Sequence, residues 1–413
     1  MKLWILNHVA LKPNESGITR HYDLSNEIVK KGHQVTIFAS SFNVFRFQWR
    51  NPRKKNYQEN VNGVIFEWLW SLPYFGNGPK RLLNWISYFI LAIFRGLKKR
   101  KEKPDVIVGS SVHLFACLAA YFLSKLLKAK YVVEIRDLWP RTLIDFGVIT
   151  ERHPLAILLG IIERFVYKKA EKIIVTLPGA ADYIASLGID RNKIYYIPNG
   201  IHMSRIEDLT NQPSLEGEIN KIRENHEKIA MYIGSHGHAN ALDTIVQSAK
   251  YLDSKQIALV FIGEGAEKST LKKLAEPFSN IYFFESIPKE EVLSTLNLAD
   301  ILMVSMLNTS LYKYGISLNK LNDYLLAGKP VIFAGNVLNN IIEASGAGVT
   351  VQPEDPVEFA EGIEILLHLS EEEVKQIKDK AFQYANEHHN IEKLAEKFLN
   401  VCSSNTKKEG LLS

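Results

Sequence analysis

Short apolar runs separated by amphipathic stretches set the pattern of the first half of the chain. Runs rich in β-branched and aromatic residues predict buried strands at KLWILN, QVTIFAS, VIFEWL, DVIVGS, YVVEI, KIIVTL and KIYYIP. Helical patterns separate several of these runs, as in ITRHYDLSNEIVKKG, which closes at Gly32. Strands that alternate with helices predict a parallel sheet covered on both faces.

The same rhythm restarts in the second half. After a polar, charged stretch at 202–228, further strands are predicted at IAMYIG, IALVFIG, IYFFES, ILMVSM, PVIFAG and GVTVQ. We therefore expect an α/β protein of two doubly wound domains, 1–201 and 229–385, joined by 202–228 as a linker. The segment 386–413 carries a last helix near Glu392–Val401, which fits on either domain and can pack back on the first. A length of 413 residues suits two domains.

Cysteine usage and apolar run lengths predict a cytoplasmic protein. Cys117 and Cys402 lie far apart and form neither a disulfide framework nor a metal-ligand spacing, so we expect a reducing cytosol. The N-terminal MKLWILNHVA is too short for the core of a signal peptide. No stretch reaches the roughly 20 apolar residues that a membrane span requires.

Charge is distributed unevenly along the chain. Residues 1–103 hold 18 Lys and Arg against 6 Asp and Glu, and the remainder is net acidic. Basic and aromatic residues cluster at 42–55 and at 84–103, where an amphipathic helix with a cationic end is predicted. Such a helix suits an anionic membrane surface, although a packed helix with a solvated end also fits. No nucleic-acid-binding module accompanies the charge, so we expect no nucleic-acid partner.

Two consecutive strands of the second half end in glycine turns. Gly234 and Gly237 lie in MYIGSHGHANAL, and Gly263 and Gly265 lie in VFIGEGAEKSTL. Ligands bind at the carboxyl ends of strands in such sheets, where glycine lets backbone amides approach an anion. A purely steric need for glycine also fits each turn. Neither turn matches a dinucleotide-binding fingerprint or a Walker motif.

A third stretch, YKYGISLNKLNDYLLAGKPVI at 312–332, shows which known family these motifs resemble. Together with YIGSHGHANAL, FIGEGAEKSTL and FFESIPKEEVLSTLNLADILMVSM, it resembles the retaining glycosyltransferases of family four. GITRHYDLSNEIVKKGHQVTIFA, EIRDLWP and IPNGI match in the first half. The resemblance implies the GT-B fold, two Rossmann-like domains facing a cleft. RDLWP and the 312–332 stretch resemble the bacterial surface-polysaccharide branch, which includes N-acetylfucosamine transferases.

The family usually carries two glutamates spaced by seven residues in the 312–332 stretch. The second holds the ribose of the nucleotide, and the first lies near the donor sugar. In this chain Asp323 occupies the second position and Gly315 the first. Aspartate still accepts hydrogen bonds from hydroxyls, whereas glycine cannot replace a carboxylate. The resemblance therefore implies a nucleotide site with one carboxylate missing.

The departing diphosphate needs a positive partner, because sugar transfer leaves negative charge on it. Many relatives place Arg and Lys in the loop that reads GSHGHANAL here, where His236 and His238 help only if protonated. We expect Lys320 to take this role, and no metal, since the chain has no Asp-x-Asp motif. The residues assigned to the donor by resemblance are Gly17, Gly234, Gly237, Gly263, Gly265, Ser286, Ser317, Asn319, Lys320, Leu321 and Asp323.

Arg136 and Asp137 of EIRDLWP stand where relatives contact the donor sugar, although an ion pair between them also fits. With Lys320 they are the candidate catalytic residues. The resemblance implies retaining transfer of an N-acetylated hexosamine or deoxyhexosamine from a UDP-sugar to a polyprenyl-diphosphate-linked saccharide. We expect this at the inner face of the plasma membrane, in capsule or O-antigen synthesis. A sugar-nucleotide epimerase of the same fold and a non-catalytic sugar-nucleotide-binding protein are the alternatives.

Overall fold

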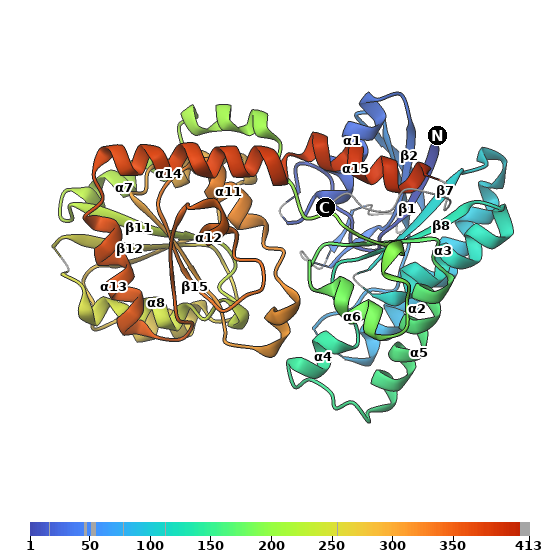
Figure 1. Ribbon diagram of the computed structural model, residues 1–413, viewed down its shortest axis with the longest axis horizontal. Coiled ribbons are helices and arrows are strands. Elements are labelled where there is room, and N and C mark those ends of the chain that lie inside the picture. The colour runs from blue at the N-terminus through green and yellow to red at the C-terminus, as the bar shows by residue number, and fades with distance from the viewer. Residues whose placement is uncertain are drawn as a thin grey trace. The chain divides into compact units, whose positions relative to one another are not determined.

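The computed structural model describes residues 1–15, 17–44, 48–50, 55–76, 78–111, 113–253 and 255–404, without the side chain of Pro79. Part of the predicted basic segment 42–55 lies outside these ranges. The chain divides into two compact units. The first comprises Met1–Asn199 with Ile391–Ser413, and the second comprises Gly200–Asn390. Each unit is a sheet between two layers of helices (Figure 1).

The first unit is built on an eight-stranded sheet in the order β10-β9-β8-β7-β1-β2-β6-β5. Neighbouring strands are parallel, except that β5 runs antiparallel to β6 at the edge. The strands are β1 (Lys2–Leu6), β2 (Gln34–Ser40), β5 (Tyr57–Val61), β6 (Val64–Leu69), β7 (Val106–Ser110), β8 (Lys130–Ile135), β9 (Lys172–Val175) and β10 (Ile194–Tyr196). A separate hairpin pairs β3 (Phe42–Asn43) with β4 (Gln48–Trp49).

Helices cover both faces of the first sheet. On one face α2 (Pro79–Lys98), α3 (Leu114–Leu127) and α5 (Pro154–Lys169) pack side by side. On the other face α1 (Arg20–Lys30) packs against α15 (Ile391–Ser403), as Figure 1 shows. Shorter helices are α4 (Arg141–Asp145) and α6 (Ala180–Ser186). The last helix, which fitted either domain by sequence, therefore belongs to the first unit, because its apolar stripe, including Leu394 and Phe398, completes that unit's core.

The second unit has a six-stranded, fully parallel sheet in the order β13-β12-β11-β14-β15-β16. Its strands are β11 (Lys228–Ile233), β12 (Ile257–Ile262), β13 (Ile281–Phe284), β14 (Ile301–Ser305), β15 (Val331–Ala334) and β16 (Gly348–Val351). One core cluster includes residues of α7 (Glu216–Arg223), α10 (Val292–Asn297), α11 (Asn319–Ala327), α12 (Ile341–Ser345) and α14 (Glu371–Tyr384). The other includes residues of α8 (Leu242–Ser248), α9 (Lys268–Ala275) and α13 (Pro356–Leu367).

The expected fold class, two doubly wound Rossmann-like domains, is confirmed, and every strand predicted from an apolar run is present. The structure differs over 202–228, which was expected to be a linker. These residues belong to the second unit and form the 3-10 helix η3 (Met203–Thr210) and α7. Ile219 and Ile222 are buried in the core of that unit, so isolated apolar residues within a charged stretch were enough to anchor it.

Candidate functional site

In the second sheet the strand order reverses between β11 and β14. In doubly wound sheets, ligands bind at the carboxyl ends of the strands beside such a reversal. The loop after β11, residues 234–241, is fastened there to β14. The hydroxyl of Ser305 donates to the carbonyl oxygens of Asn240 at 2.5 Å and Ala241 at 3.0 Å. Helix α11 begins beside this loop, because Tyr324 on α11 accepts a hydrogen bond from the Ile233 amide at 3.0 Å.

Lys320, in the first turn of α11, brings a positive charge to this loop. Its Nζ donates to the hydroxyl of Tyr232 and to Oδ1 of Asn240, each at 2.8 Å. The ammonium also lies 4.3 Å from the centroid of the Tyr232 ring. Within the described part of the chain, no carboxylate comes within ion-pairing distance of Lys320. A partly buried ammonium held only by neutral acceptors can therefore receive an anionic ligand.

Burial lowers the pKa of Lys320 from 10.5 to about 7. The environment therefore disfavours the ammonium form while no anion is bound. An anionic group placed beside Nζ would reverse this effect, since an opposite charge favours the protonated form. The site is arranged so that ligand charge and lysine charge stabilise each other.

Asp323, one turn further along α11, is already paired. Nη1 of Arg205, on η3, lies 2.6 Å from Oδ1 of Asp323. Arg205 also contacts Oδ2 of Asp208 at 3.4 Å and donates to the Lys289 carbonyl at 3.4 Å. Burial raises the pKa of Asp323, and Arg205 opposes that rise. The ion pair holds the carboxylate through Oδ1. In the part of the chain that the structure describes, Arg205 does not bond to Oδ2, so the group can still accept a hydroxyl hydrogen bond.

The two glycine turns pack against each other at Gly263 and Gly265. A Cβ added at Gly263 would overlap the carbonyl of Gly234, and one added at Gly265 would overlap the backbone of His236. Gly234 and Gly263 also have positive φ values of 157° and 145°. At Gly237 the nearest atom to an added Cβ is Ser235 Oγ, at 3.4 Å. Close packing thus requires Gly263 and Gly265, and a role of these glycines toward a ligand stays a prediction.

His236 cannot supply the missing cation at neutral pH. Its side chain is fully buried among the rings of Tyr232, Phe261 and Phe283. Burial, with a contribution from the nearby Lys268 charge, lowers the pKa of His236 to about 4. The imidazole is therefore neutral at pH 7, whereas Nζ of Lys320 donates directly to Asn240 of this loop.

The remaining donor residues lie around the same edge of the second sheet. Ser317 and Asn319 precede and begin α11, and exposed Ser286 follows β13. Leu321 has a buried side chain in the core, so only its backbone can face a ligand. Gly315 has φ 95° at the end of a short 3-10 helix, a conformation that favours glycine over a side chain that bears a carboxylate.

Arg136 and Asp137 lie in the first unit, directly after β8. The Arg136 amide donates to Oγ of Ser111 at 2.9 Å, which fastens this loop to the end of β7. Among the residues that the structure describes, the two side chains are not within ion-pairing distance of each other. Burial raises the pKa of Asp137 and the Arg136 charge opposes that rise, so the two charges still interact and the structural alternative stays open. Gly17 lies in the loop between β1 and α1 with φ 126°. Whether these three residues contact a donor stays a prediction.

A buried polar network lies beneath these loops of the first unit. Glu134 on β8 accepts from Arg20 Nε at 2.9 Å, and its other oxygen lies 2.7 Å from His21 and 2.6 Å from Ser110. Burial alone would raise the pKa of Glu134, but Arg20 and His21 hold it well below the usual range. Arg20 also donates to the Ile197 carbonyl at 2.9 Å. The network joins α1 to three strands at the carboxyl edge of the sheet.

Both halves of the chain match family models of known proteins. Residues 16–200 match the family model described as "Glycosyl transferase 4-like domain", and residues 227–368 match "Glycosyl transferases group 1". The chain is 22% identical over 285 residues to "Probable glycosyltransferase WbjE" of Pseudomonas aeruginosa, covering 66% of this chain and 68% of that protein.

Solved structures show the same fold at low identity. Sucrose-phosphate synthase from Thermosynechococcus elongatus superposes with a TM-score of 0.75 at 15% identity, covering 97% of this chain and 98% of that one. WaaG, a glycosyltransferase involved in lipopolysaccharide biosynthesis, gives 0.67 at 14%, covering 98% and 100%. Anabaena HepE in complex with UDP-glucose gives 0.66 at 12%, covering 98% and 100%.

The GT-B fold and the two matched family models, which together span most of the chain, define a class, the glycosyltransferases of the GT-B fold. The chain belongs to it, as a glycosyltransferase 4-like domain followed by a group 1 glycosyltransferase domain.

Sequence reasoning missed three residues of the site. Arg205 lies in the stretch taken for a linker, and Tyr232 and Asn240 lie in a motif chosen for its glycines. The available signal was the position of Tyr232 and Asn240, which flank the glycines of the loop after one strand. Nothing local indicated Arg205, because its partner Asp323 is 118 residues away.

Proposed function

We propose that this glycosyltransferase moves a sugar, with retention, from a UDP-sugar to a polyprenyl-diphosphate-linked saccharide during capsule or O-antigen synthesis. The proposal of a UDP-sugar donor rests on Lys320. Its partly buried ammonium has only neutral hydrogen-bond partners, beside the point where the strand order of the second sheet reverses. A diphosphate supplies the anion that this arrangement lacks. Anabaena HepE, of the same fold, has been solved with UDP-glucose bound.

In this proposal Asp323 accepts hydrogen bonds from the ribose hydroxyls, and Arg205 holds the carboxylate in position. Lys320 and the amides of the loop after β11 stabilise the diphosphate as the bond from the sugar to phosphate breaks. We expect this stabilisation without a metal ion. Arg136 and Asp137 are proposed to orient the transferred sugar.

The N-acetylated hexosamine or deoxyhexosamine donor rests on RDLWP and the 312–332 stretch. The polysaccharide context is supported by the similarity to WbjE and by the fold shared with WaaG. A polyprenyl-linked acceptor stays in the bilayer, so we propose that the enzyme works at the inner face of the plasma membrane. No helix among the described residues is long and apolar enough to span a membrane.

A panel of UDP-sugars tests the donor half. The correct donor should raise the melting temperature and release UDP, slowly with water and faster with a lipid-linked acceptor. NMR of the product should show the donor's anomeric configuration. Conversion of the donor to an epimer without UDP release would establish the epimerase alternative, and binding with neither reaction would indicate a non-catalytic protein.

A further inference from the structure

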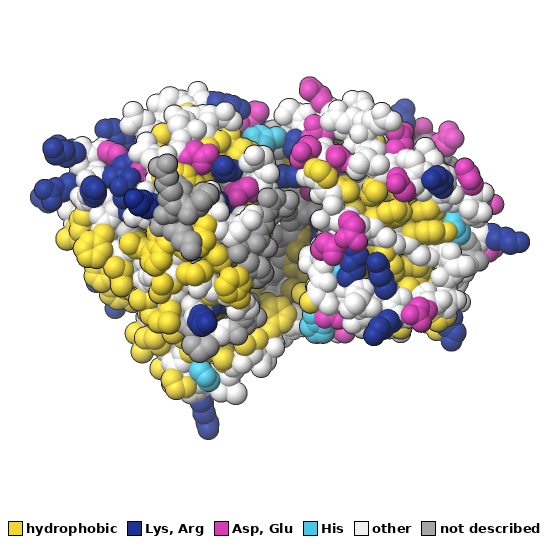
Figure 2. All heavy atoms as spheres, turned by 180° about the vertical axis from the view of Figure 1, so that it is seen from behind, with side chains coloured by type: hydrophobic (Ala, Val, Ile, Leu, Met, Phe, Trp, Pro, Cys, Tyr) yellow, Lys and Arg dark blue, Asp and Glu magenta, His cyan; other side chains and the backbone are white. Residues whose placement is uncertain are grey.

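One outer face of the first unit carries many exposed hydrophobic side chains. They come from α2, α3 and α5, three helices that lie side by side on the sheet. Phe94 and Ile161 are 69% and 62% exposed. We call this set the docking face: Leu83, Ile90, Phe94, Phe122, Leu126, Ile157, Leu158 and Ile161. Figure 2 shows hydrophobic side chains gathered over much of the unit on the left, with Lys and Arg near their upper edge.

The docking face is a regular feature of the helices. Leu83, Ile90 and Phe94 are spaced seven and four residues apart, so they form one stripe along α2. Trp85 and Tyr88 on the same helix are buried. Helix α2 is therefore apolar on its inner side and along an outer stripe, whereas a helix that only covers a sheet has a polar outer side. A contiguous apolar patch of this kind marks an interaction surface.

Ring contacts join the three helices into one continuous surface. Phe89 of α2 lies edge-on to Phe122 of α3, with centroids 6.1 Å apart. Tyr121 of α3 lies edge-on to Phe165 of α5, with centroids 5.0 Å apart. The exposed side chains of the docking face are thus carried by a packed layer of helices.

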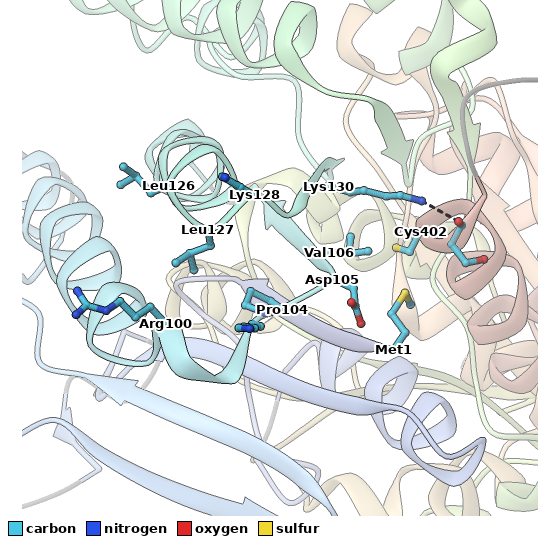
Figure 3. Close-up of a pocket in the computed structure, with 12 residues that line it drawn as sticks. Met1, Arg100, Pro104, Asp105, Val106, Leu126, Leu127, Lys128, Lys130 and Cys402 are labelled. Carbon is cyan, nitrogen blue, oxygen red and sulfur yellow. Dashed lines mark hydrogen bonds between the residues drawn. The ribbon is translucent and has the colours of Figure 1, made fainter.

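Cations lie at one end of the docking face. An open pocket of about 880 Å³ is lined by Arg100, Lys103 and Lys128, and also by Leu126 of the docking face (Figure 3). All three cations are exposed, and in the described ranges none has a carboxylate within ion-pairing distance. Lys130 differs, since its ammonium donates to the Ser403 carbonyl at 2.9 Å. Asp105 also lines the pocket, where its carboxylate accepts from the Lys2 amide at 2.7 Å. The apolar surface is therefore continuous with exposed cations that this carboxylate does not pair.

We propose that the docking face and these cations bind the anionic surface of a lipid bilayer. The apolar side chains would enter the interface between headgroups and acyl chains, and the cations would face lipid phosphates. This inference rests on the proposed function, whose acceptor stays in the bilayer. Nucleic acid would use the cations and leave the apolar residues without a role. A second copy of the chain would bring its own cations toward like charges.

The basic and aromatic stretch 84–103, predicted to suit a membrane surface, also contains residues that the structure turns toward the protein interior. Trp85 is only 4% exposed and stacks on His113, with ring centroids 5.0 Å apart. Arg95 and Lys99 form ion pairs with Glu67, at 2.7 Å and 2.5 Å. These residues stabilise the packing of α2, because the helix turns them toward the sheet.

Co-sedimentation of the full-length protein with vesicles tests the proposal. Wild type should bind vesicles of phosphatidylcholine and phosphatidylglycerol, and binding should fall with salt and without the anionic lipid. Replacing Arg100, Lys103 and Lys128 by glutamine should weaken binding about 100-fold, since each cation near an anionic leaflet contributes about fivefold. The matched control replaces three exposed lysines of the second unit, Lys255, Lys273 and Lys375, by glutamine and should bind like wild type.

Two double variants test the role of the apolar side chains in vesicle binding. Phe94→Ser with Leu126→Ser should weaken vesicle binding at least tenfold, whereas Leu338→Ser with Ile365→Ser, exposed residues of the second unit, should not. Wild type that stays in the supernatant, or variants that sediment like their controls, would overturn the proposal. So would a dimer in sedimentation velocity that Phe94→Ser with Leu126→Ser converts to monomer.

UDP affinity, measured by calorimetry on the same proteins, separates this inference from the proposed function. All the variants should bind UDP like wild type. A protein that binds anionic vesicles through the docking face but binds no UDP would retain the surface and lose the donor assignment. Normal UDP binding without vesicle binding would overturn the docking face and leave the donor assignment intact.

Discussion

Arg205 and Asp323 form an ion pair of 2.6 Å between the 3-10 helix at the start of the second unit and the first turns of α11. The sequence assigned the ribose to this aspartate alone. The arginine restricts the carboxylate, and in the proposed function this would reduce the entropy lost when a nucleotide binds. A carboxylate one methylene shorter than the family's glutamate is thus held in place by a residue from elsewhere in the unit.

Asp323→Ala should weaken UDP binding by about 1.5–3 kcal/mol, in line with the loss of a charged hydrogen-bond acceptor. Asp208→Ala is the matched control, because it removes the other carboxylate beside Arg205, at 3.4 Å, and leaves Asp323 in place. Titration calorimetry measures both. Unchanged UDP affinity in folded Asp323→Ala would remove this residue from the site.

Lys320→Met should lower kcat by about 10²–10³, the usual cost of removing one group that stabilises charge developing in the transition state. Binding of the intact UDP-sugar should weaken less, because the extra charge on the diphosphate appears only as the bond breaks. Lys313→Met, at an exposed lysine nearby, serves as the control. Normal turnover in Lys320→Met would assign the role to backbone amides.

UDP binding should take up a proton between about pH 8 and 9. Lys320 has its pKa lowered to about 7 by burial, so it is mostly neutral in this range, and the diphosphate favours the ammonium. Calorimetry in two buffers of different ionisation enthalpy measures the uptake. The Lys320→Met variant should take up fewer protons on binding UDP. Equal proton uptake in both proteins would contradict the assignment of Lys320 to the diphosphate.

The same shift has a defined sign for stability. The unfolded lysine has a pKa near 10.5 and the folded one near 7, so the unfolded state binds more protons between these values. The free energy of unfolding of the second unit should therefore receive a contribution that rises with pH from 7 to 10.5. Urea denaturation should show this rise in wild type and a smaller one in Lys320→Met. An equal rise in the two proteins would show that the pKa of Lys320 is not lowered.

Gly263→Ala should destabilise the second unit by about 2–4 kcal/mol, since its Cβ would overlap the Gly234 carbonyl and φ is positive. Gly237→Ala should change stability by less than about 1 kcal/mol, because its site has room and an ordinary φ. Thermal denaturation compares them. If Gly237→Ala keeps its melting temperature but loses UDP affinity, Gly237 serves the ligand rather than the packing.

The site was predictable in part. The 312–332 stretch singled out Lys320 and Asp323 by its resemblance to a family motif, and the structure places both on one helix, α11. The hydrogen-bond partners of Lys320 were not predictable, because Tyr232 and Asn240 lie 88 and 80 residues away in the sequence. The protonation of His236 also depended on burial by rings from neighbouring strands.

Local patterns in the sequence are enough to specify the helices, the strands and the class of fold. Buried strands and amphipathic helices depend on neighbours two to four positions apart, so their order could be deduced from periodicity. Three-dimensional packing determines which charges pair, that 202–228 folds into the second unit, and that α15 completes the first. It also turned Trp85 inward and left Phe94 exposed on the same helix. Those outcomes depend on strand order and on contacts between distant segments, which no local pattern of residues encodes.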